Sequence, residues 1–363
     1  MSTLNVDSLL KLAVVQDASD LHLVAGNPPR LRINGELGSI DVPALSAQDV
    51  RELVDGLLGP EAKEMLEARG QVDISYEVPD LARFRVNAFV HFGGLGAVVR
   101  VVPSEVIPLD TLKLPPVVGN LCRRRSGFVL VTGATGSGKS TTLTAMVDRI
   151  NDEREGHVVL IEQPIEAVHK SKRCLVSQRE VGVHTTGFTS ALRSALRQDP
   201  DVVVLGEMRD RETIRLAVTA AEMGTLVIGT LHTAGAIATI DRIVNVFPAV
   251  EQPYIRGMLS TSLSGVVSQA LLKRIDGGGR VAAVEVLINN SAVANLIREG
   301  KFEQLESVIQ AGGLQGMQSF DNAVRKLLDA RLIGVDEACR VARKPEQFAH
   351  LKTRRVGAGG DSK

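Results

Sequence analysis

One run of residues combines glycines, a lysine and hydroxyl side chains at a spacing that could bind phosphate. Glycines let backbone N–H groups turn inward around phosphate oxygens, and a lysine adds a cation for the β- and γ-phosphates. The Ser140 hydroxyl is placed to ligate Mg²⁺. We therefore predict a binding site for ATP with Mg²⁺, made by Gly133, Ala134, Thr135, Gly136, Ser137, Gly138, Lys139, Ser140 and Thr141.

The neighbouring residues predict the strand and the helix that such a loop needs. Phe128–Thr132 has the continuous apolar pattern of a buried strand, and Thr141–Ile150 is typical of a helix. In this order the helix N-terminus, with its dipole, faces the phosphates. A chance glycine-rich turn, the alternative, would have no such neighbours.

Two carboxylates follow other apolar runs and could take part in hydrolysis. Glu162 follows Val158–Ile161, and Glu207 follows Val202–Leu205 after Gly206. Ligands bind at the edge where the carboxyl ends of parallel strands meet. We expect Glu162 to be the base that orients and deprotonates water. Glu207 lies in a Walker B position in which Gly206 replaces the usual aspartate, so we expect it to act on Mg²⁺ or its waters. The alternatives are a surface acid for Glu162 and a capping glutamate for Glu207.

A histidine follows one more apolar strand at the same predicted edge. The run Leu226–Leu231 leads directly into His232 and Thr233. A histidine after a strand can be purely structural, which is the alternative here. Its position at this edge favours a role in sensing the γ-phosphate.

The pattern of strands and helices divides the chain into four parts. Residues 1–102 have the short strands and amphipathic helices of an α+β domain, and 103–117 hold four prolines and form a linker. In 118–351 apolar strands alternate with helices, which predicts an α/β domain with a largely parallel sheet and a helical C-terminal part. Residues 352–363 are glycine-rich and polar, so we expect them to be disordered.

The composition argues against several classes of protein. Lys+Arg and Asp+Glu both number 42, so no chain-wide basic surface for nucleic acid is expected. The 3 cysteines are far apart and support neither a disulfide framework nor a zinc site. We expect neither a signal peptide nor a membrane-spanning helix, and therefore a cytoplasmic protein.

Two other classes of nucleotide-binding protein lack their signatures. No Asn-Lys-x-Asp segment reads guanine, which argues against a GTPase. Leu263–Gln269 only superficially matches the signature of transporter ATPases, because its second glycine is missing. We predict an ordinary helix there.

Taken together, these motifs resemble the type II/type IV secretion ATPases, and among them the PilT-type retraction ATPases of type IV pili. The resemblance covers roughly residues 1–350. The main matching segments are Gly133–Thr141, Ile161–His169, Gly206–Asp210 and Gly229–Thr233. Further matches are Ser19–Leu23, Arg83–Asn87 and Ala292–Glu299.

The resemblance implies a fold, a function and partners. It implies a PAS-like N-terminal α+β domain, a RecA-like P-loop ATPase domain and a homohexameric ring. It implies hydrolysis of ATP to power pilus retraction and twitching motility. Such a motor would dock, from the cytoplasm, on a pilus platform protein of the inner membrane, and would act indirectly on the pilus fibre.

The resemblance also implies roles for single residues. By motif, Glu162 lies in the Asp box, Glu207 in Walker B and His232 in the His box. Arg85 and Arg100 match the arginines that reach the nucleotide from the N-terminal domain. Arg83 is a weaker candidate for that role.

Three features of this chain stand out against the family that it resembles. It cannot supply the tetracysteine zinc element of the assembly enzymes, which favours retraction. Gln163 replaces the aspartate of the Asp box, which predicts slower hydrolysis, and Ala294 replaces the first arginine of the retraction motif, which bears on coupling. One alternative is a nucleotide-gated accessory or regulatory subunit with weak hydrolysis. Another is a RecA-like nucleic-acid translocase, against which the zero net charge and the 3% aromatic content count.

Overall fold

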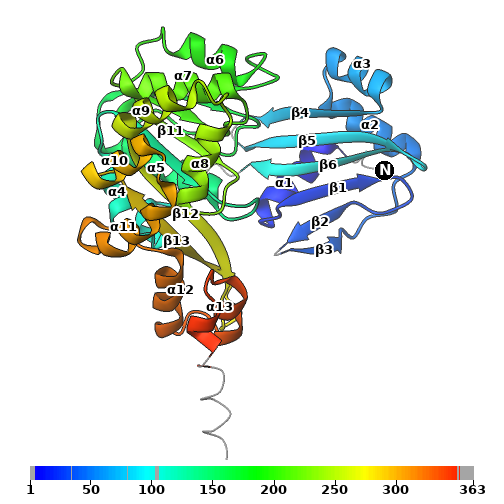
Figure 1. The fold of residues 1–363 in the computed structure, drawn as a ribbon. Coiled ribbons are helices and arrows are strands. Elements are labelled where there is room, and N and C mark those ends of the chain that lie inside the picture. The colour runs from blue at the N-terminus through cyan, green and yellow to red at the C-terminus, as the bar shows by residue number, and fades with distance from the viewer. Residues whose placement is uncertain (1–4, 34, 80, 103–105, 350, 352–363) are drawn as a thin grey trace, which may run out of the picture. The chain divides into compact units, whose positions relative to one another are not determined.

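The chain forms two compact units, each with its own sheet and core (Figure 1). The computed structural model describes residues 5–33, 35–79, 81–102, 106–349 and 351. Contacts assign Met1–Glu105 and Glu166–Val168 to the first unit, and Val106–Ile165 and His169–Lys363 to the second.

The first unit is built on a six-stranded sheet in the order β3-β2-β1-β6-β5-β4, in which all neighbours are antiparallel. Its strands are β1 (Asp20–Val24), β2 (Arg30–Ile33), β3 (Glu36–Ser39), β4 (Gln71–Val78), β5 (Ala82–His91) and β6 (Gly94–Val102). Its helices are α1 (Val6–Val15), α2 (Ala47–Leu57) and α3 (Pro60–Arg69).

Local sequence signals account for helix α2. The Ser46 side chain accepts from the Asp49 backbone N–H, while the Asp49 carboxylate accepts from the Ser46 N–H, a capping box that starts the helix. The apolar positions that follow recur at i, i+3, i+4 and i+7, so they form one stripe on the helix. That stripe is buried in the core of the unit, and consists of Val50, Leu53, Val54 and Leu57.

The second unit is built on a seven-stranded sheet in the order β13-β12-β7-β11-β10-β8-β9. All neighbouring strands are parallel except β12 and β13, which are antiparallel. The strands are β7 (Gly127–Thr132), β8 (Gly156–Glu162), β9 (Cys174–Glu180), β10 (Val202–Leu205), β11 (Leu226–Leu231), β12 (Leu263–Lys273) and β13 (Arg280–Ile288).

Helices cover this sheet and continue to the C-terminal end of the described chain. The α-helices are α4 (Val117–Cys122), α5 (Lys139–Glu153), α6 (Phe188–Ala195), α7 (Arg211–Glu222), α8 (Ala236–Asn245), α9 (Gln252–Ser262), α10 (Ser291–Glu299), α11 (Leu305–Ala311), α12 (Phe320–Asp329) and α13 (Val335–Val341). The 3₁₀ helices are η1 (Leu109–Leu112), η2 (Phe302–Gln304) and η3 (Gly312–Gln315).

Strand β7 shows why the strand pattern is apolar throughout. Its side chains alternate between two cores: Phe128 and Leu130 pack in one, and Val129 and Val131 in the other. A parallel strand covered on both faces cannot show a polar side. The α/β fold class predicted from the sequence, with helices on both faces of a largely parallel sheet, is confirmed.

One element predicted from the sequence is wrong. Leu263–Gln269, expected as a helix, belongs to β12, which pairs with β7 in parallel and with β13 antiparallel. A short apolar run has no periodicity that separates a buried strand from a helix, so pairing within the sheet decides the conformation.

Some sequence predictions fall partly outside the described residues. Of the predicted linker 103–117, residues 103–105 lie outside, while the rest includes η1 and the start of α4. The tail predicted to be disordered, 352–363, lies outside as well. No described helix is long and apolar enough to cross a membrane.

Candidate nucleotide site

The predicted phosphate loop connects β7 to α5, as the sequence pattern requires. Gly133 opens it with a φ of +146°, and a Cβ there would lie 2.3 Å from the backbone oxygen of Gln269 and 2.5 Å from the Ser137 Oγ. Only glycine fits this position, because any side chain would meet fixed backbone. The loop therefore begins with its backbone pressed against β12.

Lys139 points back into the loop from the first turn of α5. Its Nζ donates to the carbonyl oxygens of Gly133, at 2.8 Å, and Ala134, at 3.0 Å. Burial lowers the pKa of Lys139, and the negative charge of Glu207 partly offsets this. The loop thus contains a buried cation whose partners here are neutral carbonyls, which suits a phosphate.

A glutamine of β12 holds the loop from outside. Gln269 is buried, and its Nε2 donates to the Ser137 carbonyl at 2.8 Å. Its Oε1 accepts from the Thr142 hydroxyl of α5 at 3.0 Å. One amide therefore joins the loop to the helix that follows it. The sequence does not point to this residue, because the pattern of its segment predicts a helix without a role in the site.

The hydroxyl groups of the loop fit an ATP–Mg²⁺ ligand. Ser140 and Thr141 are exposed at the start of α5, where a helix N-terminus attracts phosphate. The Ser137 hydroxyl is buried and has no hydrogen-bond partner among the described residues, so it could donate to a phosphate oxygen. Mg²⁺ at such loops takes few protein oxygens besides those of the nucleotide and water.

The structure brings together three residues that the sequence placed on separate segments. His232 Nε2 lies 3.0 Å from Glu207 Oε1, and His232 Nδ1 lies 3.5 Å from Lys139 Nζ. Arg209, just beyond Glu207, reaches the other carboxylate oxygen at 2.7 Å. Because the ends of β10 and β11 lie side by side, a carboxylate and an imidazole meet beside the phosphate loop.

The charge of Glu207 is set by these neighbours. Burial works against ionisation, but the hydrogen bond from Arg209 and the proximity of His232 outweigh it, so the pKa of Glu207 lies below its ordinary value. An ionised Glu207 can only accept, so His232 donates to it through Nε2. The arrangement keeps a negative charge next to the phosphate loop at neutral pH.

Glu162 ends β8 and is buried. Gln178 of β9 donates from Nε2 to Glu162 Oε2 at 3.0 Å, and its Oε1 accepts from the His169 N–H at 2.7 Å. The bond from His169 fixes the direction of the Gln178 amide, and the bond from Gln178 therefore orients the Glu162 carboxylate. Sequence reasoning also missed Gln178, because a glutamine inside a strand carries no motif.

The structure gives a reason for glycine at the position of the usual Walker B aspartate. A Cβ on Gly206 would lie 3.2 Å from the Glu162 Cα and 3.4 Å from its Cγ. Glycine therefore allows β8 and β10 to approach closely at the point where Glu162 leaves the strand. Gln163, which follows, is exposed.

The two arginines predicted to reach nucleotide lie in the first unit. Arg85 of β5 and Arg100 of β6 stand directly opposite each other in the sheet. Arg100 Nε pairs with the buried Asp20 at 2.8 Å, and Arg85 lies 3.8 Å from Asp73. Arg83 lies two residues before Arg85, on the same face of β5. The sheet thus places the arginines side by side, and both Arg85 and Arg100 remain substantially exposed.

Comparisons with known proteins give a consistent result. The family described as type II/IV secretion system protein matches residues 3–332. A type IV pilus retraction ATPase of Pseudomonas aeruginosa, PilT, is 50% identical over 95% of this chain and 100% of its own length. A twitching motility protein of Neisseria gonorrhoeae is 48% identical over 94% of this chain and 91% of its own length. The crystal structure of the pilus retraction motor PilT with bound ADP superposes with a TM-score of 0.89 and 45% identity, covering 95% of this chain and 98% of that one.

Proposed function

Because this chain belongs to the type II/IV secretion system protein family and is an ATP-hydrolysing enzyme, we propose that its hydrolysis powers type IV pilus retraction and twitching motility. The observation that carries the proposal is the 50% identity to a retraction ATPase over that protein's entire length. The cluster of Lys139, Glu207 and His232 beside the phosphate loop supports the proposal. Through this cluster, phosphate binding would be connected to the ends of β10 and β11.

In this proposal the loop and its neighbours bind and orient ATP. Lys139 exchanges its carbonyl partners for the β- and γ-phosphate oxygens, and the backbone N–H groups of Gly133–Thr141 surround them. Ser140 would hold Mg²⁺ with its hydroxyl, and the ionised Glu207 would help hold it through the waters around it. Bound Mg²⁺ would neutralise charge on the β- and γ-phosphates.

Glu162 and His232 act at the reacting end of the nucleotide. Glu162 accepts a proton from water as the water oxygen attacks the γ-phosphorus. The bond between the γ-phosphorus and the oxygen that bridges the β- and γ-phosphates breaks, which gives ADP and phosphate. His232, held between Glu207 and Lys139, is placed to respond when the γ-phosphate leaves. Gln178 keeps the Glu162 carboxylate in one orientation.

The proposal includes an assembly and partners. The chain forms a homohexamer in which Arg85 and Arg100 of one subunit reach the nucleotide of a neighbour. Mixing Arg85→Ala/Arg100→Ala subunits with Lys139→Ala subunits should then restore some activity, and inactive mixed rings would contradict action between subunits. The motor works in the cytoplasm at the inner membrane, against a pilus platform protein. No nucleic acid takes part.

Helix α10 is the segment that transmits the stroke in this proposal. It matches the retraction motif, begins at an Asn290 cap and buries Val293 and Ile297, while Arg298 on its surface remains exposed. Arg298→Ala should reduce retraction more than ATP turnover. A folded variant with normal retraction would remove α10 from the account.

The test of the proposal is the phenotype of a deletion. Cells without this gene should carry more surface pili and move less by twitching, because extension continues without retraction. Bald cells would indicate an assembly motor instead.

One alternative keeps a specific observation in its favour. Gln163 stands where the family carries an aspartate, which suits an accessory subunit that binds nucleotide but hydrolyses it weakly. Steady-state turnover of the full chain separates the two. Gln163→Asp should raise the rate if the amide is what limits it, and an unchanged rate would contradict that reason.

A further inference from the structure

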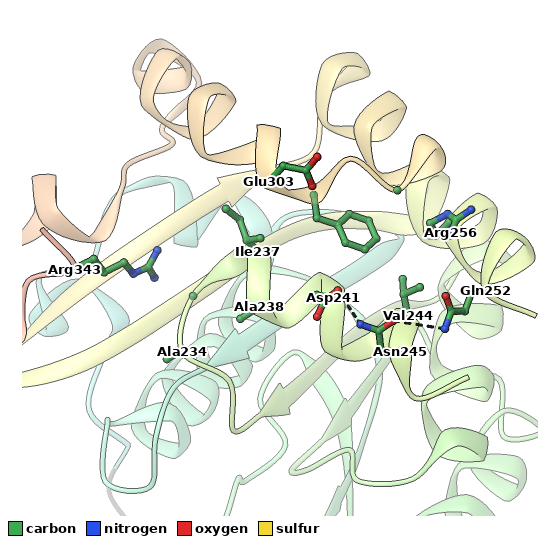
Figure 2. A pocket seen from close by; sticks show the side chains of 13 residues that line it. Ala234, Ile237, Ala238, Asp241, Val244, Asn245, Gln252, Arg256, Glu303 and Arg343 are labelled. Carbon is green, nitrogen blue, oxygen red and sulfur yellow. Dashed lines mark hydrogen bonds between the residues drawn. The ribbon is translucent and has the colours of Figure 1, made fainter. Parts of the chain in front are cut away.

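A groove of about 700 Å³ runs along α8, starting two residues after His232. Figure 2 shows Ala234 and Arg343 toward one end of it, and Gln252 and Arg256 toward the other. The end near Ala234 therefore lies between the nucleotide site and the chain beyond α13. The contacts at this end involve a carboxylate that the proposed mechanism does not use.

That carboxylate belongs to Glu285 of β13, which is 1% exposed. Its Oε1 accepts from the Ala236 N–H at 2.7 Å, and its Oε2 accepts from the Phe320 N–H at 3.3 Å. Ala236 and Phe320 are the first residues of α8 and α12. A single buried side chain thus caps two helices, and the positive ends of both helix dipoles face its charge.

Arg343 supplies the counter-charge from the segment after α13. Its Nη1 lies 2.7 Å from Glu285 Oε2. Its Nη2 lies against Gly235, where an added Cβ would be only 2.4 Å away. The Arg343 backbone N–H donates to Asp321 of α12 at 2.8 Å. The C-terminal segment is therefore bonded to Glu285 and to Asp321, and its guanidinium lies close to Gly235, the residue before α8.

The start of α8 is tied to the residue next to His232. The Thr233 hydroxyl lies 2.7 Å from the Thr239 hydroxyl, which in turn donates to the Gly235 carbonyl at 2.6 Å. The Gly235 N–H donates to Ser268 at 2.8 Å. A shift of the α8 N-terminus would therefore move Thr233, and with it the adjacent His232.

We propose that Glu285 and Arg343 are positioning residues for His232, and that they connect the nucleotide site to the C-terminal helices. Buried ion pairs are sensitive to the loss of one partner, because the other charge is left without compensation. Loss of Arg343 would therefore loosen the α8 N-terminus and the His232 loop. The inference rests on the proposed function, in which His232 responds to the γ-phosphate.

The test is a double-mutant cycle between Arg343→Ala and His232→Ala, read as kcat and KM of the full-length protein. Arg343→Ala should lower kcat by about 10–100-fold with little change in KM, by analogy with residues that orient the ligands of metal sites. In the His232→Ala background it should cause no further loss, because residues that act through one another are not additive. Arg343→Lys keeps the charge and should lie between wild type and Arg343→Ala.

A neighbouring ion pair provides the matched control. Lys344, one residue along, pairs with Glu306 of α11 at 2.6 Å, and both side chains are about half exposed. Lys344→Ala should leave kcat near the wild-type value. If Arg343→Ala does not fold, Arg343→Lys takes its place in the same cycle.

The outcomes separate this inference from the proposed function. Additive losses in the cycle, or a wild-type kcat for the Arg343 variant, would overturn the positioning role while leaving the site intact. A wild-type kcat for His232→Ala alone would overturn the role of His232 in the proposed function, and the positioning role with it.

Discussion

At the scale of single residues, the site depends on carboxylates whose orientation and charge are fixed by neighbours. Gln178 sets the direction of Glu162, while Arg209 and His232 lower the pKa of Glu207. The two acids therefore have different roles in the proposal. The oriented Glu162 handles the proton of water, and the ionised Glu207 handles the cation.

Glu162→Gln tests this division. The amide keeps the shape of the side chain but removes its basicity, so nucleotide binding should persist while turnover falls by ~10²–10⁴-fold. Binding of ADP and steady-state hydrolysis would be measured on the same preparation. Glu155→Gln, an exposed carboxylate just before β8, is the control and should hydrolyse normally. Near-normal hydrolysis by the Glu162 variant would transfer the role of base to Glu207.

At the scale of elements, the phosphate loop is held between α5 and β12. Gly133 and Gly136 both have positive φ, +146° and +76°, but only Gly133 faces another element closely. Replacing each of the two glycines by alanine therefore separates the effect of backbone strain from the effect of packing against β12.

Gly133→Ala should weaken ADP binding by at least ~10-fold, because its Cβ would force the loop away from the Gln269 backbone oxygen, 2.3 Å away. Gly136→Ala should lower the free energy of unfolding by only about 1–2 kcal/mol, the cost of a left-handed backbone at a residue with a side chain. No atom lies within 4 Å of its added Cβ, so nothing would push the loop away from β12. Affinity and melting temperature of both variants decide the matter. Equal affinities would show that β12 does not restrain the loop.

The far end of α5 gives a prediction about pH. Hydrogen bonds from Arg123 foremost, and from Arg149, lower the pKa of Glu153 from 4.5 to about 2 despite some desolvation. A lowered pKa stabilises the fold fully above 4.5, and this contribution is lost as the pH falls toward about 2. Because these side chains are partly exposed, we expect the ion pairs of Glu153 to contribute about 0.5–1 kcal/mol to the free energy of unfolding at neutral pH.

Glu153→Gln should therefore destabilise the protein at pH 7, and its difference from wild type should begin to shrink below about pH 4.5. Urea unfolding at several pH values measures this difference. Glu155→Gln, whose carboxylate is more exposed and whose arginine partner is farther away, at 3.5 Å, should show little difference at any pH. A Glu153 effect independent of pH would contradict the electrostatic origin.

Elements with local signals could be predicted from the sequence, and those fixed by distant contacts could not. The strand at Gly127–Thr132 and the helix after the loop follow from apolar runs and glycine spacing. Gln269, in contrast, contacts Thr142 and Ser137, which are 127 and 132 residues away along the chain. Gln178 and Glu285 likewise act through pairing of strands and helices, and no local pattern marks such contacts.

The roles of Glu162, Glu207, Arg85 and Arg100 toward nucleotide stay predictions.

At the scale of the whole molecule, nucleotide chemistry and mechanical work are assigned to different parts of the second unit. Lys139, Glu207 and His232 lie at the phosphate loop, while α10, the helix proposed to transmit the stroke, lies beyond β13. The central claim is that hydrolysis at this loop drives pilus retraction. If this is so, loss of the Lys139 side chain should stop retraction while the protein is still made at its normal level.

The most direct measurement is live imaging of labelled pili in cells whose only copy of the gene encodes Lys139→Ala. The variant removes the cation that binds the β- and γ-phosphates, so hydrolysis should be abolished. We expect normal protein levels, pili that still extend, and retraction events far rarer than in wild type. Retraction at the wild-type frequency, or cells that make no pili, would contradict it.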